Sequence, residues 1–153
     1  MPDLRSYLNE IDNAIFRPDT PMSVVQEITA LQHAMAARNA NPAIFVRQPK
    51  LADGTISDMP VLTNLFASRE LAAKALGIDD HRDSAKALSN LSSKAIDPVV
   101  VDAADAPVRD IVDEGDAANL LSLPALRQHE DDVGHYITCG HIVTYDPDTG
   151  IDN

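Results

Sequence analysis

The sequence predicts a layered α/β domain followed by the beginning of a β-rich unit, and three observations support this prediction. Up to about residue 96, segments with helical periodicity alternate with short β-branched runs, as in layered α/β domains. Residues 97–153 carry 13 acidic and two basic side chains, a charge of −11, whereas residues 1–96 carry 11 acidic and 10 basic ones. The stretch "HYITCGHIVTY" at 135–145 predicts a strand, and "DPDTG" after it predicts a turn. The change in charge places a candidate boundary at Asp97–Pro98.

The first helix and strand are predicted near the amino terminus. "LRSYLNEI" has one apolar helical face, formed by Leu4, Tyr7, Leu8 and Ile11. "AIFRPDTP" predicts a short strand broken by Pro18 and Pro21, because proline cannot donate to a strand ladder.

A second helix is predicted in "SVVQEITALQHAM". Its apolar stripe consists of Val24, Ile28, Leu31 and Met35. Ser23 and Gln26 are expected to form a capping box at its start. His33 lies off the stripe and is expected to face solvent.

The next elements are two strands and two helices. "PAIFV" at 42–46 and "MPVLTN" at 59–64 are compact β-rich runs that predict strands. "SRELAAKALG" at 68–77 predicts a helix that Gly77 ends. A further helix is expected over residues 84–95, with three residues facing inward, namely Leu88, Leu91 and Ala95.

The acidic segment is expected to contain further strands and one short helix. "DPVVV" at 97–101 and "APVRDIV" at 106–112 predict strands. "DAANLLSLP" predicts a short helix that is capped by Asp116 and stops before Pro124. The strand predicted over 135–145 enters a hairpin whose second arm should follow Gly150.

Composition and charge exclude several classes of protein. The sequence contains no run of about 18 apolar residues, which a membrane-spanning helix would need. Its charged start lacks the apolar core of a signal peptide. One cysteine excludes an internal disulfide and fits a cytoplasmic protein. The net charge of −12 argues against nucleic-acid binding, because the chain would repel a phosphate backbone. We therefore expect neither nucleic-acid nor membrane partners.

The stretch "HEDDVGHYITCGH" at 129–141 raises the possibility of a metal site or a nucleophile. In an extended strand, His135, Cys139 and His141 would share one face. The two histidines would be roughly 20 Å apart at about 3.3 Å per residue, which is too far for one zinc ion. A Cys139–His141 catalytic pair lacks an evident orienting group. The residues alone favour a strand whose odd-numbered face packs inward, although zinc chemistry remains an alternative.

Taken together, the order of segments resembles the amino-terminal part of the UbiD-type decarboxylases, which depend on prenylated flavin mononucleotide. The matching pieces run over nearly the whole chain and are, in order, "DLRSYLNEID", "EITALQ", "PAIFV", "MPVLTNLFASRELAAKALG", "APVRDIVDEGDAANLLSLPALRQHEDDVGHYIT" and "IVTYDPDTGIDN". The resemblance depends on the order and spacing of these pieces, since no single one is diagnostic.

This resemblance implies a fold and two site residues. Residues 1–105 would form a small layered α/β domain, and residues 106–153 would begin a split β-barrel that binds the flavin. Thr138, in "YITCG", matches a strand threonine beside the flavin. Asn153 matches an asparagine whose side-chain oxygen ligates the divalent metal, Mn²⁺ or Mg²⁺ and possibly with K⁺, that clamps the flavin phosphate. An oxygen-rich metal site would supply counter-charge beside an acidic segment.

The resemblance also implies what the chain lacks. The family's other metal ligands and its residues acting on the substrate carboxylate would lie beyond residue 153, and Glu114 and Glu130 match nothing catalytic. We therefore expect a split subunit, a fragment or a remnant that is inactive alone and needs its carboxy-terminal complement. With that complement it would decarboxylate an aromatic or α,β-unsaturated carboxylic acid, and the completed enzyme would be a homo-oligomer.

The competing prediction belongs to a different class of protein. A non-catalytic interaction module would use the unfinished hairpin at the carboxy-terminal end to pair with a strand of a partner chain. The two hypotheses differ in whether the assembled protein binds a flavin and a metal.

Overall fold

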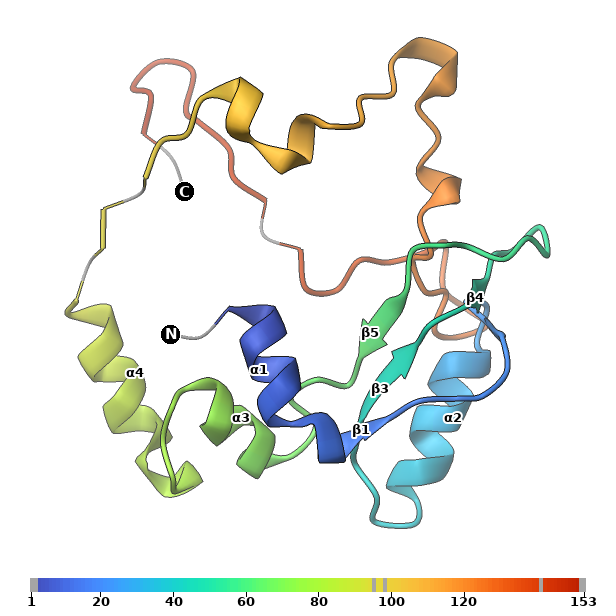
Figure 1. Ribbon diagram of the computed structural model, residues 1–153, viewed down its shortest axis with the longest axis horizontal. Helices are drawn as coiled ribbons and strands as arrows, with labels where there is room; N and C mark the ends of the chain where they lie inside the picture. Colours follow the sequence, from blue (N-terminus) through green and yellow to red (C-terminus); the bar gives the residue numbers. More distant parts are fainter. Residues whose placement is uncertain (1–2, 95, 98, 141, 152–153) are drawn as a thin grey trace.

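A computed structural model describes residues 3–94, 96–97, 99–140 and 142–151. The regular helices and strands lie within residues 4–92 (Figure 1). The helices are α1 (Leu4–Glu10), α2 (Glu27–Ala36), α3 (Arg69–Ala75) and α4 (Ser84–Ser92). The strands are β1 (Ile15–Phe16), β2 (Met22–Ser23), β3 (Ala43–Val46), β4 (Pro49–Lys50) and β5 (Val61–Thr63). This arrangement confirms the mixed α/β class for the amino-terminal part.

The main sheet has three strands in the order β1–β3–β5, with β1 parallel and β5 antiparallel to the central strand β3. Successive side chains of a strand point to opposite faces, and β3 shows this clearly. Ile44 and Val46 pack with Ile28 of α2 on one face, in a core cluster that also contains Met22 and Val61. On the other face, Ala43 packs in a second cluster with three buried residues, Tyr7, Ile11 and Leu71. Helix α2 therefore covers one face of the sheet, and α1 and α3 cover the other.

The start of α2 differs from the predicted capping box by one residue. Gln26 has a left-handed backbone conformation (φ 65°) and makes no side-chain cap hydrogen bond. Instead, the Ser23 N–H donates to a carboxylate oxygen of Glu27 (2.6 Å), and Ser23 Oγ accepts from the Val25 N–H (3.1 Å). The shift follows from the backbone of Gln26, whose N–H donates to the Arg127 carbonyl (2.8 Å) before the helix begins.

The end of α3 agrees with the prediction, and its start has a side-chain cap. Ser68 Oγ accepts from the Leu71 N–H (3.1 Å) at the start of the helix. Gly77 follows its end with a positive φ of 68°, a conformation that glycine adopts without steric cost. The Gly77 N–H donates to the Lys74 carbonyl (2.9 Å), which closes the last turn.

Helix α4 is shorter than predicted, and its apolar residues do not face inward. Leu88 is 55% exposed and Leu91 is 36% exposed, while Ala95 lies outside the described residues. Apolar periodicity identifies the face that a helix can bury, but burial also needs a neighbouring element. The exposure of Leu88 and Leu91 shows that the described elements leave this face of α4 largely uncovered.

The two strands predicted over 97–112 are not formed in the described part of the chain. Short 3-10 turns occur there instead, at Ala103–Asp105 and Pro107–Arg109. The valines of this segment are largely exposed, as shown by Val99, Val100 and Val108. A β-branched run becomes a strand only when another strand offers backbone partners, and none of the described residues does so here.

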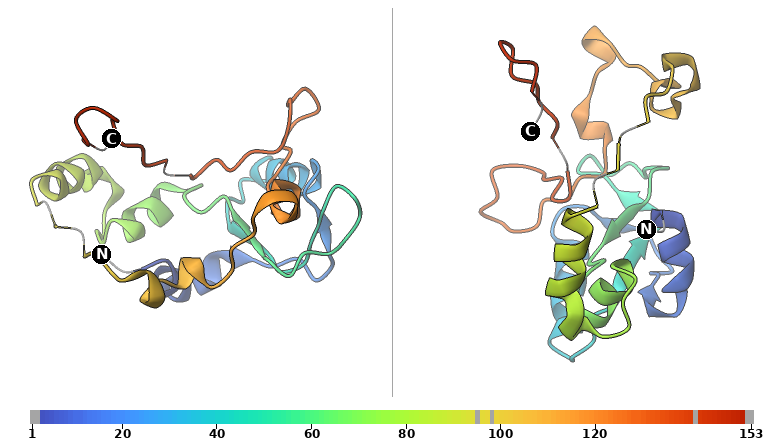
Figure 2. Two further views of the ribbon diagram at one scale, coloured as in Figure 1. Left: turned by 90° about the horizontal axis from the view of Figure 1, so that it is seen from above. Right: turned by 90° about the vertical axis from the view of Figure 1, so that its left-hand side faces the viewer.

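The short helix predicted over 116–124 is replaced by two 3-10 turns, Gly115–Ala117 and Leu120–Ser122. Asp116 lies inside the first turn and does not cap it, whereas the Asn119 side chain accepts from the Leu121 N–H (3.0 Å) at the second. These residues belong to the first of two arms, one before residue 124 and one after residue 135, that extend from the same side of the α/β domain (Figure 2).

The second arm contains the predicted turn but not a continuous strand. Among the described residues of 135–145, Tyr136 forms a bridge with Leu126, and residues 138–139 lie in a turn. The turn after Tyr145 is confirmed, since Asp146 Oδ1 accepts from the N–H groups of Asp148 (2.9 Å) and Thr149 (2.8 Å). A split barrel is therefore not seen in this part of the structure.

Replacing Tyr7 by phenylalanine is expected to destabilise the α/β domain by about 1–3 kcal/mol. The buried Tyr7 hydroxyl donates to the Leu71 carbonyl (2.7 Å) and so joins α1 to α3. Removing the hydroxyl breaks this hydrogen bond between the two helices. Urea unfolding would measure the change, with Tyr145→Phe as the control because Tyr145 is 69% exposed.

Candidate functional site

The acidic segment returns to the α/β domain by extending its smaller sheet. Strands β2 and β4 are parallel neighbours, and Arg127 forms a parallel bridge with Val25 directly beyond β2. The Arg127 N–H donates to the Val24 carbonyl (3.0 Å), and the Tyr136 N–H donates to the Leu126 carbonyl (2.8 Å). Leu126 packs against the core cluster beside α2. Residues 125–136 are thereby attached to the domain by backbone pairing and by apolar burial.

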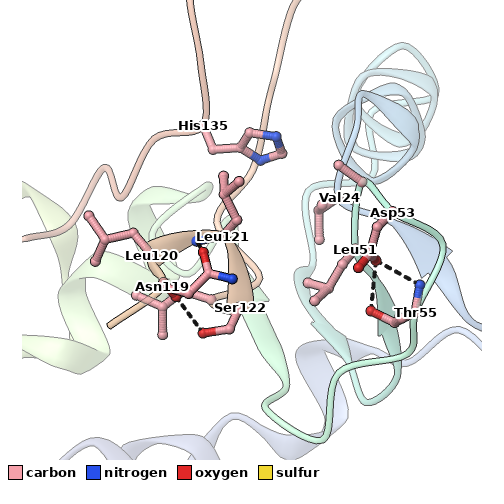
Figure 3. Close-up of a pocket in the computed structure, with 11 residues that line it drawn as sticks. Val24, Leu51, Asp53, Thr55, Asn119, Leu120, Leu121, Ser122 and His135 are labelled. Carbon is pink, nitrogen blue, oxygen red and sulfur yellow. Dashed lines mark hydrogen bonds between the residues drawn. The ribbon is translucent and has the colours of Figure 1, made fainter. Parts of the chain in front are cut away.

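This attachment creates the larger of two described depressions, with a volume of about 540 Å³ (Figure 3). One wall is the turn after β4, which includes Leu51, Asp53 and Thr55. The opposite wall consists of residues 119–123, and His135 lies at one end between the two walls. The volume falls in the range of about 300–1,000 Å³ that is common for binding pockets.

The turn after β4 has a fixed shape. The Leu51 N–H donates to the Thr55 carbonyl (2.8 Å), and Gly54 between them has a φ of +91°. Asp53 Oδ1 accepts from both the backbone N–H (2.9 Å) and the hydroxyl (2.7 Å) of Thr55. The hydrogen bond from the Thr55 N–H holds the pKa of the Asp53 carboxyl below its usual range. The Asp53 side chain is therefore an anion at neutral pH.

His135 is oriented by the backbone. Its Nδ1 lies 2.7 Å from the Ala125 carbonyl oxygen, and because a carbonyl can only accept, Nδ1 carries a proton. In the neutral ring, Nε2 is then a hydrogen-bond acceptor. Ring orientation is thus fixed by the same segment that pairs with β2.

The side chains that line this pocket limit what it can bind. Its walls are mainly aliphatic, with Val24, Leu51, Leu120, Leu121 and Leu123, and no lysine or arginine lines it. Asp53 and His135 are its titratable side chains. A phosphate or carboxylate would find no permanent positive charge here, so the pocket favours apolar groups and hydrogen-bond donors.

The second depression, of about 310 Å³, contains positive charge that is partly neutralised. Arg17 and Arg47 line it together with Asp19. The Arg17 guanidinium forms an ion pair with Asp12 (2.5 Å). Asp19 adds a negative charge to the same lining, so little net positive charge is left to bind an anion.

Of the predicted site residues that the structure describes, Thr138 and Cys139 line neither depression, whereas His135 lines the larger one. Thr138 is exposed and lies in the turn at 138–139 of the second arm. Asn153 lies outside the described residues. Cys139 is exposed, His135 is bound to the Ala125 carbonyl, and His141 also lies outside the described residues. No group of three or more potential metal-binding side chains occurs within the part of the chain that the structure describes.

The "HEDD" loop forms a closed turn around one of its own carboxylates. Asp132 Oδ2 accepts from the N–H groups of Gln128 (2.9 Å) and His129 (2.9 Å). The hydrogen bond from His129 lowers the pKa of the Asp132 carboxyl. His33 is exposed, as predicted, but its ring lies 5.9 Å from that of His129, a contact that the sequence did not indicate. The loop thus has a structural role at the junction of α2 and the acidic segment.

Sequence reasoning missed the residues that form the larger pocket. "DG" at 53–54 is a recognised turn signal and could have located its first wall. Nothing in the order of residues brings Leu120 and Leu121 to that turn, because their approach depends on the Val25–Arg127 bridge.

Comparisons with known proteins match two family models to this chain. The model described as "3-octaprenyl-4-hydroxybenzoate carboxy-lyase N-terminal domain" matches residues 10–91. The model described as "3-octaprenyl-4-hydroxybenzoate carboxy-lyase Rift-related domain" matches residues 99–153. An uncharacterized protein of Aquifex aeolicus (strain VF5) is 28% identical over 173 residues, which cover 99% of this chain and 34% of that protein.

Two similar solved structures are of the UbiD-class enzyme HmfF from Pelotomaculum thermopropionicum. An evolved dimeric form in complex with prFMN has a TM-score of 0.79 and 26% identity, and the match covers 98% of this chain and 34% of HmfF. A second HmfF structure, in complex with FMN, has a TM-score of 0.79 and 25% identity, over 98% of this chain and 32% of HmfF. The chain therefore spans about a third of the length of these relatives.

Most of the described helices and strands lie in the region of the first family model, and the turn before residue 151 lies in the region of the second. None of the described helices has the length and apolar character that crossing a lipid bilayer requires. Since the family models match residues 10–91 and 99–153, which together are most of the sequence, the chain belongs to the UbiD family of carboxy-lyases and corresponds to its amino-terminal part.

Proposed function

We propose that this chain is the amino-terminal part of a UbiD-type decarboxylase and that it acts together with the remaining part of the family fold, about two thirds of its length. The observation that supports this most directly is the match to HmfF, which covers 98% of this chain but 34% of that enzyme. The reaction is the reversible, non-oxidative decarboxylation of an aromatic or α,β-unsaturated carboxylic acid. Family membership favours this function over a non-catalytic interaction module.

We further propose prenylated flavin mononucleotide as the cofactor, since one HmfF structure is a complex with prFMN and the other a complex with FMN. When bound, this cofactor supplies an electron sink for loss of carbon dioxide. In this proposal Thr138 helps to position the flavin, and its exposure leaves the side chain accessible to a ligand. Residues 1–105 are the first domain and residues 106–153 begin the flavin-binding domain.

Asn153 is proposed to hold a divalent metal, Mn²⁺ or Mg²⁺, through its side-chain oxygen. K⁺ is proposed as the second cation where one is needed. The charge of the acidic segment supports a metal. With a charge of −11, residues 97–153 would repel a flavin phosphate unless a cation lay between them. Amide and carboxylate oxygens are the ligands that these hard cations prefer.

The chain's own residues have limited roles in this proposal. They attach the acidic segment to the α/β domain and present Thr138 and Asn153, while the groups that act on the substrate carboxylate belong to the rest of the fold. The completed enzyme is proposed to be a homo-oligomer.

The test is to assemble the chain with its carboxy-terminal complement, load it with prFMN and Mn²⁺, and measure release of carbon dioxide. A panel of aromatic and α,β-unsaturated acids would identify the substrate class. We expect flavin absorbance in the purified assembly and decarboxylation of at least one class. An assembly that binds no flavin, or a loaded one that is inert to the whole panel, would contradict the proposal.

A further inference from the structure

The larger pocket exposes apolar side chains that a folded protein normally covers. Leu120 is 82% exposed and Leu121 is 72% exposed, although both lie opposite Leu51 in the same depression. Their position is held by the Asn119 side chain, which accepts from the Leu121 N–H, and by the Ser122 hydroxyl, which donates to the Asn119 carbonyl (2.6 Å). Leu120 and Leu121 share this depression with Leu51, Val24 and Leu123, and a contiguous exposed apolar surface is typical of a site that binds another protein segment.

The charge of the pocket restricts what could cover it. Asp53 lies on one wall, no basic residue lines the pocket, and the acidic segment that supplies the other wall belongs to the part of the chain with a charge of −11. An occupant with a carboxylate would be repelled, and one with an ammonium or guanidinium group would be attracted. The occupant should therefore combine an apolar side chain with a basic one.

The family match indicates where such an occupant comes from. The chain covers 34% of HmfF, so about two thirds of that fold has no counterpart here. A volume of about 540 Å³ accommodates several side chains of a neighbouring segment. Residues 119–123, which form one wall of the pocket, belong to a segment that extends away from the α/β domain (Figures 1 and 2).

We propose that the pocket between residues 51–55 and 119–123 is the docking site for a segment of the remaining part of the UbiD fold. The segment places an apolar side chain against Leu51 and Leu121 and a lysine or arginine beside Asp53. This inference rests on the proposed function, because it takes its partner from the completed decarboxylase.

The test compares the isolated chain with a chimera in which this chain replaces the corresponding third of HmfF. Leu121→Asp is expected to change the Tm of the isolated chain by no more than about 2 °C, since Leu121 is exposed there. In the chimera, where the pocket is filled, the same change should lower the Tm by roughly 5 °C or more. Leu88→Asp is the matched control, because Leu88 is 55% exposed on α4 and does not line the pocket.

A second variant tests the charge. Asp53→Asn keeps an Oδ1 acceptor for Thr55 and so preserves the turn. In the chimera it should reduce the dependence of Tm on salt concentration, whereas Asp58→Asn, at an exposed position outside the pocket, should not.

The docking proposal would be overturned if Leu121→Asp lowered the Tm of the isolated chain and of the chimera equally. A chimera without any substitution that does not fold would also overturn it. So would a dimer of the isolated chain that Leu121→Asp abolishes. The last result would identify a second copy as the occupant. A chimera that responds to Leu121→Asp but binds no prFMN would contradict the proposed function and leave the docking site intact.

Discussion

Replacing Asn153 by alanine in the assembled enzyme is expected to abolish metal-dependent retention of the flavin. In the function proposed above, the Asn153 side-chain oxygen is a ligand of the metal that holds the flavin phosphate. Loss of an outer-shell partner of a metal already costs roughly 10–100-fold in affinity or activity. Loss of a ligand itself should cost at least about 100-fold. Metal content, flavin absorbance and carbon dioxide release of the purified assembly would measure the effect.

The matched control is Asn90→Ala on α4, an exposed asparagine far along the chain from the proposed metal. It should leave metal and flavin contents unchanged. Full metal content and full activity after Asn153→Ala would refute the assigned role, while the decarboxylase proposal would then depend on the loaded wild-type assembly alone.

Replacing Ile44 by alanine is expected to have the largest effect on stability. Ile44 has no exposed surface and lies at the centre of β3, where it packs with Ile28 of α2 in the first core cluster. Truncating a buried isoleucine removes apolar contacts and leaves a cavity, which together cost about 2–5 kcal/mol. Domains of this size are stable by about 5–15 kcal/mol, so the variant should lose a substantial share of its stability.

Urea unfolding of the chain, followed by circular dichroism, would measure the loss at Ile44. Leu88→Ala is the control, since Leu88 is 55% exposed and its truncation should change the unfolding free energy by less than about 0.5 kcal/mol. Equal effects of the two substitutions would show that β3 is not the centre of the core.

The elements that were predicted correctly depend on contacts between residues close in the sequence. Ser68 caps α3 through the amide of Leu71 three residues later, and Gly77 ends that helix through its own backbone conformation. The turn after Tyr145 is closed by Asp146 within four residues. Such interactions are encoded locally, and a sequence pattern is enough to predict them.

The predictions that failed needed a partner distant in the sequence. The β-branched runs of 97–112 are typical of strands, but no described strand lies beside them. Leu88 lies on the apolar face of α4 and is still 55% exposed. The capping box moved from Gln26 to Glu27 because the Gln26 N–H bonds to Arg127, about a hundred residues away. Local propensity gives way in each case to the presence or absence of a tertiary contact.

The sequence by itself determined the α/β class, the segment order that identifies the UbiD family, and the charge of −11 on residues 97–153. Only the tertiary structure decided that residues 125–136 extend the sheet of β2 and β4, and that Leu120 and Leu121 lie opposite Leu51. The physical reason is that the composition of a segment and the spacing of its apolar residues show only which surface the segment could bury. Backbone pairing between residues far apart in the chain decides which of these surfaces come into contact.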